Sequence, residues 1–288
     1  MLKAALIFAG IAALISLIWL LIWKAGLIFG VKKNSGGEDK AVQRYPVPDK
    51  SNLARRAICL GALVLRGSFE TGLHGNCTTD ERQMYTDSAT RLDDWLSAKG
   101  LLTGFLPEEI NLISKEPGTW SDAEITAAMG ETERLGCLCW ALSLLRSIPP
   151  YDSRFDIKKL LPFLHLMEDN FDIQSAATLR TLDSLLNARS QAHHWDWRAT
   201  TQKIINQTKK PQDKTEYDQM ITFAAKTGCS SGYHDEPLSG DFPAFGKPYR
   251  KLTAVEFALI HNIISARLLA FDWLCGYAPE MSAVKPED

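Results

Sequence analysis

A short cluster of histidine, tryptophan and aspartate holds the first residues whose types could do chemistry. Residues 193–197 read His-His-Trp-Asp-Trp, which places His194 two positions before Asp196. Neutral imidazoles with a carboxylate can hold zinc or iron, and they can also move protons in hydrolysis. However, adjacent helical residues point about 100° apart, and the zinc motif His-Glu-x-x-His is absent from the sequence. We therefore predict neither a metal ion nor another cofactor, and keep His194 and Asp196 as catalytic candidates.

A third catalytic candidate, His234, lies in the long segment 228–250. This segment has four glycines, three prolines and no periodicity, which predicts a loop. A loop of this length is usually functional or disordered, although the residues around His234 are also ordinary turn residues. Histidine with aspartate and serine or cysteine could build a nucleophilic triad, but the spacing selects no set and the Gly-x-Ser-x-Gly motif is absent.

The charge balance and the missing phosphate-binding loops narrow the function classes. The 288-residue chain has 32 basic and 34 acidic side chains, and 45% of its residues are hydrophobic. The balance excludes a strongly basic nucleic-acid binder, and the hydrophobic content excludes a disordered chain. Neither the Walker-type phosphate loop nor the Gly-x-Gly-x-x-Gly fingerprint occurs. We predict no nucleic-acid partner and no nucleotide site of these two types.

Residues 1–31 predict a membrane anchor. Residues 4–23 carry no charged side chain, and a helix of this length rises about 30 Å, the thickness of the hydrocarbon core of a bilayer. A cleaved signal peptide has a shorter apolar stretch and ends at a small-x-small site. We therefore predict a single-pass transmembrane helix whose partner is the lipid bilayer. Lys3 precedes the run and Lys24, Lys32 and Lys33 follow it, which slightly favours a cytoplasmic domain.

The rest of the chain predicts a linker and a helical domain. Residues 32–52 are polar and contain a Gly-Gly pair and two prolines, which is typical of a flexible linker. Residues 53–288 show apolar residues at helical spacing and neither strict alternation nor a fixed repeat. The predicted fold class is therefore all-α, a transmembrane helix plus a multi-helix globular domain. Helices are expected at 53–69, from Thr78, Pro107 and Ser121, and at 131–146, 157–168, 173–192 and 252–277.

The stretch 131–146 has the clearest core pattern. Its apolar face is formed by residues at helical spacing, namely Leu135, Leu138, Leu142 and Leu145. Pro149 and Pro150 are expected to end this helix, since proline cannot continue it. Glu131 and Glu133 near its start are expected to be solvated and to match the helix dipole.

Cysteine usage gives a weaker indication of the compartment. Cys59, Cys137, Cys139 and Cys275 lie in apolar helical patterns, where a thiol behaves as a small hydrophobe. Cys137 and Cys139 point about 200° apart on a helix and cannot share a disulfide or a metal ion. This favours a reducing compartment and agrees with a cytoplasmic domain.

Several stretches resemble one bacterial family. Residues 131–156 contain Glu133, then Trp-Ala-Leu from Trp140, then Ile-Pro-Pro-Tyr-Asp from Ile148. This resembles the bacterial family of domains of unknown function numbered 4272. Residues 55–70 are similar to its opening helix, and Arg267 with residues 270–274 is similar to its closing element. The resemblance covers most of residues 53–288 and implies a mainly α-helical fold with no established activity.

The resemblance and the helical spacing point to a further set of polar residues. Leu179-Arg180 with Asp183, followed by His194-Trp195, resembles the family's middle helix. The candidates for buried ion pairs between helices are Arg134, Arg180, Asp183, Arg267 and Asp272, and such pairs can matter without any catalysis. The candidate binding residues are Arg180, Asp183, Trp195, Arg267 and Asp272.

Two functions from different classes fit these observations. The first is a non-enzymatic module that binds a protein partner at a membrane face, in a specific form an immunity protein against a toxin. That form rests on analogy. Charge reversal in residues 233–241 should then weaken partner binding. The alternative is a hydrolase or metal-dependent enzyme with a site of His194, Asp196 and His234, which must converge in a cleft. A structural subunit of an envelope assembly is a third hypothesis.

Overall fold

The structure, a computed structural model, describes residues 45–169, 173–207 and 211–279. The chain divides into two units, Met1–Val42 and Gln43–Asp288. The predicted membrane helix of residues 4–23 and most of the predicted linker lie outside the described residues and stay predictions. The end of that linker is helical, because Asp49 caps the first described helix by accepting a hydrogen bond from the backbone N–H of Asn52.

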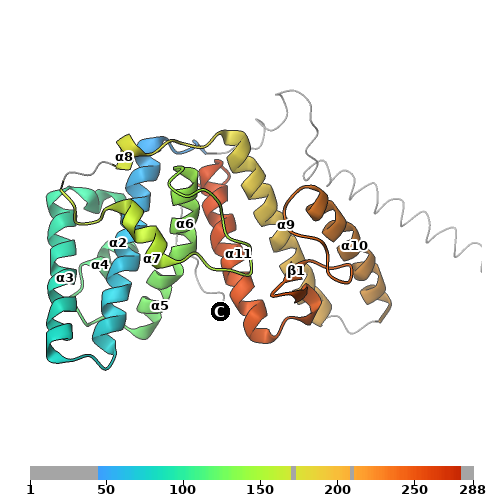
Figure 1. The fold of residues 1–288 in the computed structure, drawn as a ribbon, viewed down its shortest axis with the longest axis horizontal. Helices are drawn as coiled ribbons and strands as arrows, with labels where there is room; N and C mark the ends of the chain where they lie inside the picture. The colour runs from blue at the N-terminus through green and yellow to red at the C-terminus, as the bar shows by residue number, and fades with distance from the viewer. Residues whose placement is uncertain (1–44, 170–172, 208–210, 280–288) are drawn as a thin grey trace, which may run out of the picture. The chain divides into compact units, whose positions relative to one another are not determined.

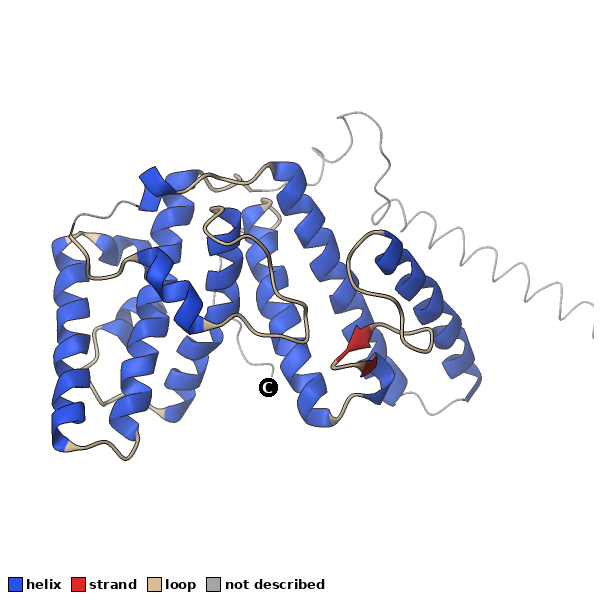
Figure 2. Ribbon diagram, viewed as in Figure 1, coloured by secondary structure: helices blue, strands red, loops and turns tan. Residues whose placement is uncertain are grey.

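The described domain is mostly helical, as predicted, and its strands are confined to one short hairpin (Figure 2). In chain order the α-helices are α2 (Lys50–His74), α3 (Thr79–Ala98), α4 (Pro107–Ile113), α5 (Asp122–Gly130), α6 (Thr132–Ala141), α7 (Ile157–Leu160), α8 (Ile173–Ala176), α9 (Leu182–Gln207), α10 (Pro211–Ser230) and α11 (Ala254–Leu274). The 3-10 turns are η2 (Leu101–Gly104), η3 (Leu161–Leu164) and η4 (Tyr249–Lys251).

Helices α2 and α11 organise the core (Figure 1). Helix α2 packs against α3, α5 and α6, and α11 packs against α6 and α9. The apolar residues Leu53, Leu60 and Val64 of α2 are fully buried. Because α6 contacts both α2 and α11, the apolar side chains form one continuous core.

The predicted helix starts are confirmed. Thr78 and Glu81 form a capping box at α3, and Ser121 and Glu124 form another at α5. Pro107 is the first residue of α4. In each box the side chain and the backbone satisfy one another's otherwise unpaired groups, so a local sequence pattern sets the start.

Helix α6 ends earlier than the sequence predicts. It stops at Ala141 rather than near Arg146, because Ser143 has a positive φ of 58° and the chain leaves the helix there. The chain after α8 then pairs with the unpaired carbonyl groups at the end of α6, because the backbone N–H of Arg180 donates to the carbonyl of Ala141. These contacts come from about 40 residues away in sequence, so they replace the expected stop at the two prolines.

Two other helix predictions need correction. The expected helix 173–192 is two helices, since α8 ends at Ala176 and α9 begins at Leu182. Helix α9 also continues to Gln207, and α10 follows at Pro211; the sequence pattern indicated neither. The helix expected at 157–168 is interrupted at Pro162, where α7 changes to the 3-10 turn η3.

Helix α11 is long and apolar enough to cross a membrane by length and composition. In the structure it packs against α6 and α9 and buries Ile260, Ile264 and Phe271. A core helix meets the same two criteria. The structure therefore gives only weak support to a membrane location through this helix, and the anchor predicted at residues 4–23 lies outside the residues that it describes.

The long segment 228–250 is ordered. Residues 228–230 end α10, and strands β1 (Pro243–Ala244) and β2 (Lys247–Pro248) form an antiparallel hairpin. The buried carboxylate of Asp241 accepts hydrogen bonds from Nε of Arg198 at 2.7 Å and from the backbone N–H groups of Phe242 and Arg250. We call the rest of this segment, residues 231–250, the hairpin loop.

The four cysteines expected in the core are buried there: Cys59, Cys137, Cys139 and Cys275. None of the six cysteines, all within the described residues, forms a disulfide. Burial raises the pKa of the Cys59 and Cys139 thiols to about 12, so both stay protonated near neutral pH.

Candidate functional site

Helix α9 divides the catalytic candidates between two faces. His194 lies on the face toward α10 and the hairpin loop, where it stacks on His234 with ring centroids 5.7 Å apart. Asp196 interacts instead with His193 and with His261 of α11. The structure therefore brings His194 and His234 together, as the enzyme hypothesis requires, but leaves Asp196 outside that contact.

The two histidines, which we call the histidine pair, each use one ring nitrogen. Nδ1 of His234 lies 2.7 Å from the carbonyl oxygen of Asp235, and His194 bonds to the carbonyl of Ala224. A neutral imidazole that donates from Nδ1 keeps a lone pair on Nε2. Both Nε2 atoms are buried and have no hydrogen-bond partner among the residues that the structure describes. We assign the neutral tautomer with Nδ1–H to both rings from these contacts.

Gly228 occupies the point on which the two Nε2 atoms converge. A Cβ atom at this position would lie 2.2 Å from Nε2 of His194 and 2.6 Å from Nε2 of His234. The backbone of α10 thus touches both nitrogens through a Cα–H group, a weak interaction at best. A metal ion bound to both nitrogens would need the space that this backbone fills. The geometry fits a closed contact between α9, α10 and the hairpin loop better than a metal centre.

The histidine pair makes the fold sensitive to acid. Burial and the neighbouring His234 lower the pKa of His194 to about 4, and burial lowers the pKa of His234 as well. In the unfolded chain both histidines titrate near about 6.5. The unfolded state therefore binds more protons between about pH 6.5 and 4. The free energy of unfolding therefore keeps its full value above about pH 6.5 and decreases as the pH falls toward 4. His194 alone accounts for a decrease of roughly 3 kcal/mol.

Urea unfolding of the full-length protein at several pH values measures this effect. The His194→Gln variant should lose less stability than the wild type between about pH 6.5 and 4, because it lacks the titrating group. His165→Gln is the matched control, since His165 lies at the surface beside Glu168. Equal pH dependence in the wild type and in His194→Gln would contradict the account.

Trp195 is a core residue that ties the hairpin loop to the rest of the domain. It is buried, its indole stacks on Tyr151 with centroids 5.2 Å apart, and its Nε1–H donates to the carbonyl of Tyr233. Nε2 of Gln191 donates to the same carbonyl at 2.7 Å. The residue predicted to bind a ligand thus holds the loop in place.

A half-buried polar cluster lies on the other face of α9. Arg189 donates from Nε to Asp272 of α11 at 2.6 Å, and Nε2 of His193 lies 3.5 Å from the same carboxylate oxygen. Burial raises the pKa of Asp196 even though His193 and His261 act to lower it. The cluster confirms Asp272 as a partner in an ion pair between helices, and its two carboxylates and two imidazoles could exchange protons.

Within the described part of the chain, Arg180 and Asp183 do not form the expected ion pairs. Arg180 donates to the carbonyls of Trp140 at 2.7 Å and of Leu145 at 2.9 Å, and its guanidinium lies 4.5 Å from the centre of the Trp140 ring. Arg180 therefore caps the end of α6. Asp183 is exposed in the first turn of α9, where a negative charge matches the helix dipole.

Arg267 forms the expected buried pair, but with a residue that the sequence placed in solvent. Nε of Arg267 donates to Glu133 at 2.9 Å, and its other nitrogens donate to the carbonyls of Pro149 and Ser153. Glu133 also accepts from the backbone N–H of Phe155. The prediction of a solvated Glu133 is wrong, because a fully buried arginine from α11 needs its charge.

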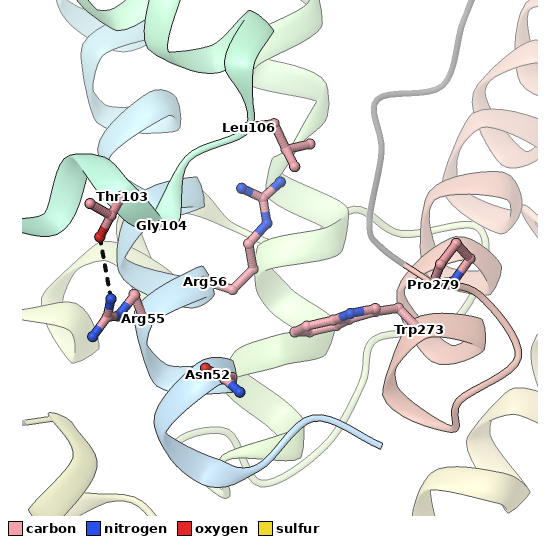
Figure 3. Close-up of a pocket in the computed structure, with 8 residues that line it drawn as sticks. All are labelled: Asn52, Arg55, Arg56, Thr103, Gly104, Leu106, Trp273 and Pro279. Atoms are coloured by element: carbon pink, nitrogen blue, oxygen red, sulfur yellow. Dashed lines mark hydrogen bonds between the residues drawn. The ribbon is translucent and has the colours of Figure 1, made fainter. Parts of the chain in front are cut away.

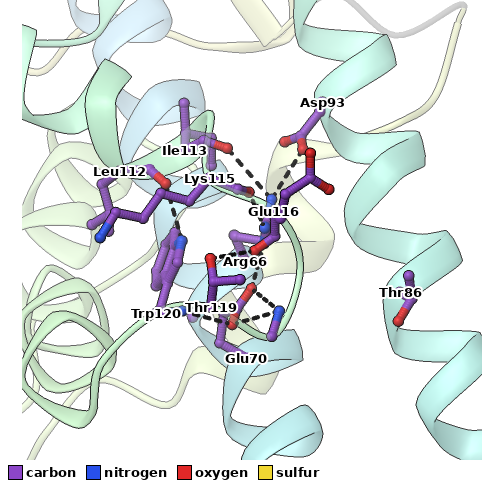
Figure 4. A network of polar contacts seen from close by, with 12 residues as sticks. Arg66, Glu70, Thr86, Asp93, Leu112, Ile113, Lys115, Glu116, Thr119 and Trp120 are labelled. Carbon is purple, nitrogen blue, oxygen red and sulfur yellow. Dashed lines mark hydrogen bonds and ion pairs between the residues drawn. The ribbon is translucent and has the colours of Figure 1, made fainter.

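A similar network lies at the far end of α2 (Figure 4). Arg66 is fully buried, bonds to Glu70 and Asp93, and donates to the carbonyl of Lys115 at 2.7 Å. Glu70 accepts in turn from the backbone N–H of Gly118. No pattern in the sequence indicated this network or the Arg198–Asp241 pair. In all three networks a buried arginine and a carboxylate together fix a loop.

Comparison with known families shows where the chain belongs. The family described as Domain of unknown function (DUF4272) matches residues 40–223, well over half of the chain. The chain belongs to the DUF4272 family. No curated protein and no solved structure matches it.

The DUF4272 match contains α2 to α9 and the first part of α10, whereas the hairpin loop and α11 lie beyond it. The stretch that carries the resemblance, residues 131–156, lies inside the match. In the structure Arg180 and Arg267 hold this stretch by its carbonyls. These two arginines, one inside the match and one beyond it, therefore stabilise the stretch that carries the resemblance. Among the described residues, no group of three or more histidine, cysteine or acidic side chains could hold a metal ion.

Proposed function

We propose that this DUF4272 protein is a single-pass membrane protein whose helical domain binds a protein partner on the cytoplasmic side. The uncharged run at residues 4–23 supports the anchor, and the lysines that follow it favour the cytoplasmic side. The specific form that we favour is an immunity protein that neutralises a toxin, which rests on analogy with small anchored helical proteins.

The observation that carries the proposal is an apolar ridge on α10. Phe223 is 62% exposed and Met220 is 37% exposed, so two large apolar side chains of α10 are accessible to a partner. Residues three positions apart lie on one face of a helix. Phenylalanine and methionine are enriched at protein interfaces, and paired anchors at this spacing are typical of a helix that docks against a partner.

The hairpin loop that follows α10 also offers exposed charged groups. Asp235 and Glu236 are exposed, while Asp241 is buried against Arg198. Because Tyr233 and Asp241 anchor the loop, its acidic side chains are presented on a fixed backbone, which lowers the entropy cost of binding. The acids favour a basic patch on the partner.

The alternative of a hydrolase or metal-dependent enzyme has less support. His194 and His234 face the backbone of Gly228 and Asp196 lies on the other face of α9, so the three predicted catalytic groups do not meet. For a hydrolase, the cluster of His193, Asp196 and Asp272 is the better source of acid–base groups.

A cross-linking pull-down from the native membrane tests the proposal. Full-length protein in mild detergent should recover a protein partner in a near-stoichiometric amount, and Phe223→Asp should lose it, because a charge removes the apolar contact. Met84→Asp is the matched control, since Met84 is 52% exposed on α3, away from α10. Recovery of the partner with Phe223→Asp, or of no partner with the wild type, would contradict the proposal.

The role of the hairpin loop and the immunity role each need a separate experiment. Charge reversal should use Asp235→Lys with Glu236→Lys, because reversal at the buried Asp241 would break the loop itself. The double variant should weaken recovery of the partner. An immunity role requires that the partner is toxic when produced alone and harmless when produced with this protein.

A further inference from the structure

A cavity of about 260 Å³ opens between the first turns of α2 and the end of α11 (Figure 3). Asn52, Arg55 and Arg56 line it from α2, and Trp273 lines it from α11. It lies beside the start of the described chain, because the backbone N–H of Tyr45 donates to the carbonyl of Gly276 near the same end of α11. The cavity is separate from the histidine pair and from the apolar ridge on α10.

Arg55 provides a positive charge at the rim. Its Nη1 donates to Oγ1 of Thr103 at 3.3 Å, and no ion pair within the described residues involves it. Gly104 allows its stem to lie close to η2, since a Cβ there would approach Cγ of Arg55 to 2.8 Å. The guanidinium is thus positioned in advance and keeps N–H groups for a ligand.

The rest of the lining leaves this charge uncompensated. Arg56 forms a two-pronged ion pair with the buried Glu109, so its charge is neutralised inside the domain. No acidic side chain is among the described residues that line the cavity. The amide of Asn52 adds neutral hydrogen-bonding groups on the same side as Arg55, while the hydroxyl of Thr103 donates to the carbonyl of Gly100 and accepts from Arg55 (Figure 3).

The opposite wall is apolar. Figure 3 shows the indole of Trp273 extending from α11 toward α2, and Leu106 closes another side. An aromatic surface of this kind accommodates a flat or aliphatic group, while arginine binds phosphate or carboxylate oxygens through paired N–H donors. The two walls therefore recognise different parts of one molecule.

We propose that this cavity binds a small organic oxyanion, a phosphate or carboxylate on an apolar body. The oxyanion binds to Arg55 with the amide N–H groups of Asn52, and the apolar body lies on Trp273. The same chemistry is present in a soluble phosphomonoester and in the headgroup of an anionic lipid. The volume is below the usual range of about 300–1,000 Å³ for ligand pockets, which limits the part that enters to a small group.

Isothermal titration of the full-length protein in detergent micelles with phenyl phosphate tests the proposal. We expect one saturable site per chain and at least about tenfold weaker binding by Arg55→Gln, because a charged hydrogen bond is lost. Arg91→Gln is the matched control: Arg91 is an exposed arginine of α3 and should leave binding unchanged. Trp273→Leu should weaken phenyl phosphate but not inorganic phosphate, which lacks the apolar part.

The source of the anion is distinguished by a second ligand. Dihexanoyl phosphatidate carries the same phosphate group on a body with acyl chains. If it binds more tightly than phenyl phosphate, the site is assigned to a lipid headgroup. If it binds more weakly, the site is assigned to a soluble phosphate. The absence of saturable binding to either ligand up to about 10 mM, or equal affinity in the wild type and Arg55→Gln, would overturn the proposal.

Discussion

Replacing Glu133 by alanine is expected to lower the free energy of unfolding by about 3–5 kcal/mol, the largest effect that we predict for a single substitution. Arg267 is fully buried, and Glu133 is the carboxylate that balances its charge. Without it the guanidinium keeps the carbonyls of Pro149, Pro150 and Ser153 and the faces of two aromatic rings, and none of these groups carries a negative charge. Removing one partner of a buried ion pair costs far more than the pair contributes, because the other charge is left without a counter-ion.

Urea unfolding of the full-length protein in mild detergent near pH 7 measures this cost. The matched control is Lys99→Ala, which removes one member of an exposed pair with Asp169 and should change stability by less than about 1 kcal/mol. Glu133→Gln should be less harmful than Glu133→Ala, since the amide oxygen can still accept hydrogen bonds. A loss below about 1 kcal/mol for Glu133→Ala would show that the pair is not buried as described.

The second large effect is expected at Gly228. Gly228→Ala would place a methyl group 2.2 Å from Nε2 of His194 and 2.6 Å from Nε2 of His234, so α10, α9 or the hairpin loop must shift. Overpacking of this kind costs about 1–3 kcal/mol. The variant should also separate the histidine pair and so reduce the dependence of stability on pH.

The control for Gly228 is Gly130→Ala at the end of α5. No atom lies within 4 Å of a Cβ at Gly130, so this variant should be neutral or slightly stabilising. Thermal unfolding followed by circular dichroism compares the two variants with the wild type. Equal midpoints for Gly228→Ala and the wild type would contradict the close contact between Gly228 and the histidine pair.

Local sequence patterns predicted much of the fold. The capping boxes at Thr78 and Ser121 involve residues three positions apart, so the sequence contains the whole interaction. The end of α6 depends instead on Arg180 and Ser143, because contacts from a distant segment replace the local proline signal. Helix α10 shows a weak pattern because it packs mainly on α9, with few buried residues such as Ile221 and Ala225.

The polar residues were harder to predict than the helices. The sequence indicated His194, His234 and Asp196 as catalytic candidates, and in the structure only the two histidines contact each other. Glu133 and Arg267 are 134 positions apart, and no periodicity reveals such a partner. Polar side chains that close loops and polar side chains that bind ligands have the same types, so only their three-dimensional partners separate the two roles.

The exposed face of α10 is proposed to bind a protein. The most direct measurement is the dissociation constant of the purified full-length protein for the partner recovered from the membrane. The account predicts saturable binding that Phe223→Asp weakens at least about tenfold and Met84→Asp leaves unchanged. Equal dissociation constants for Phe223→Asp and the wild type would contradict the account.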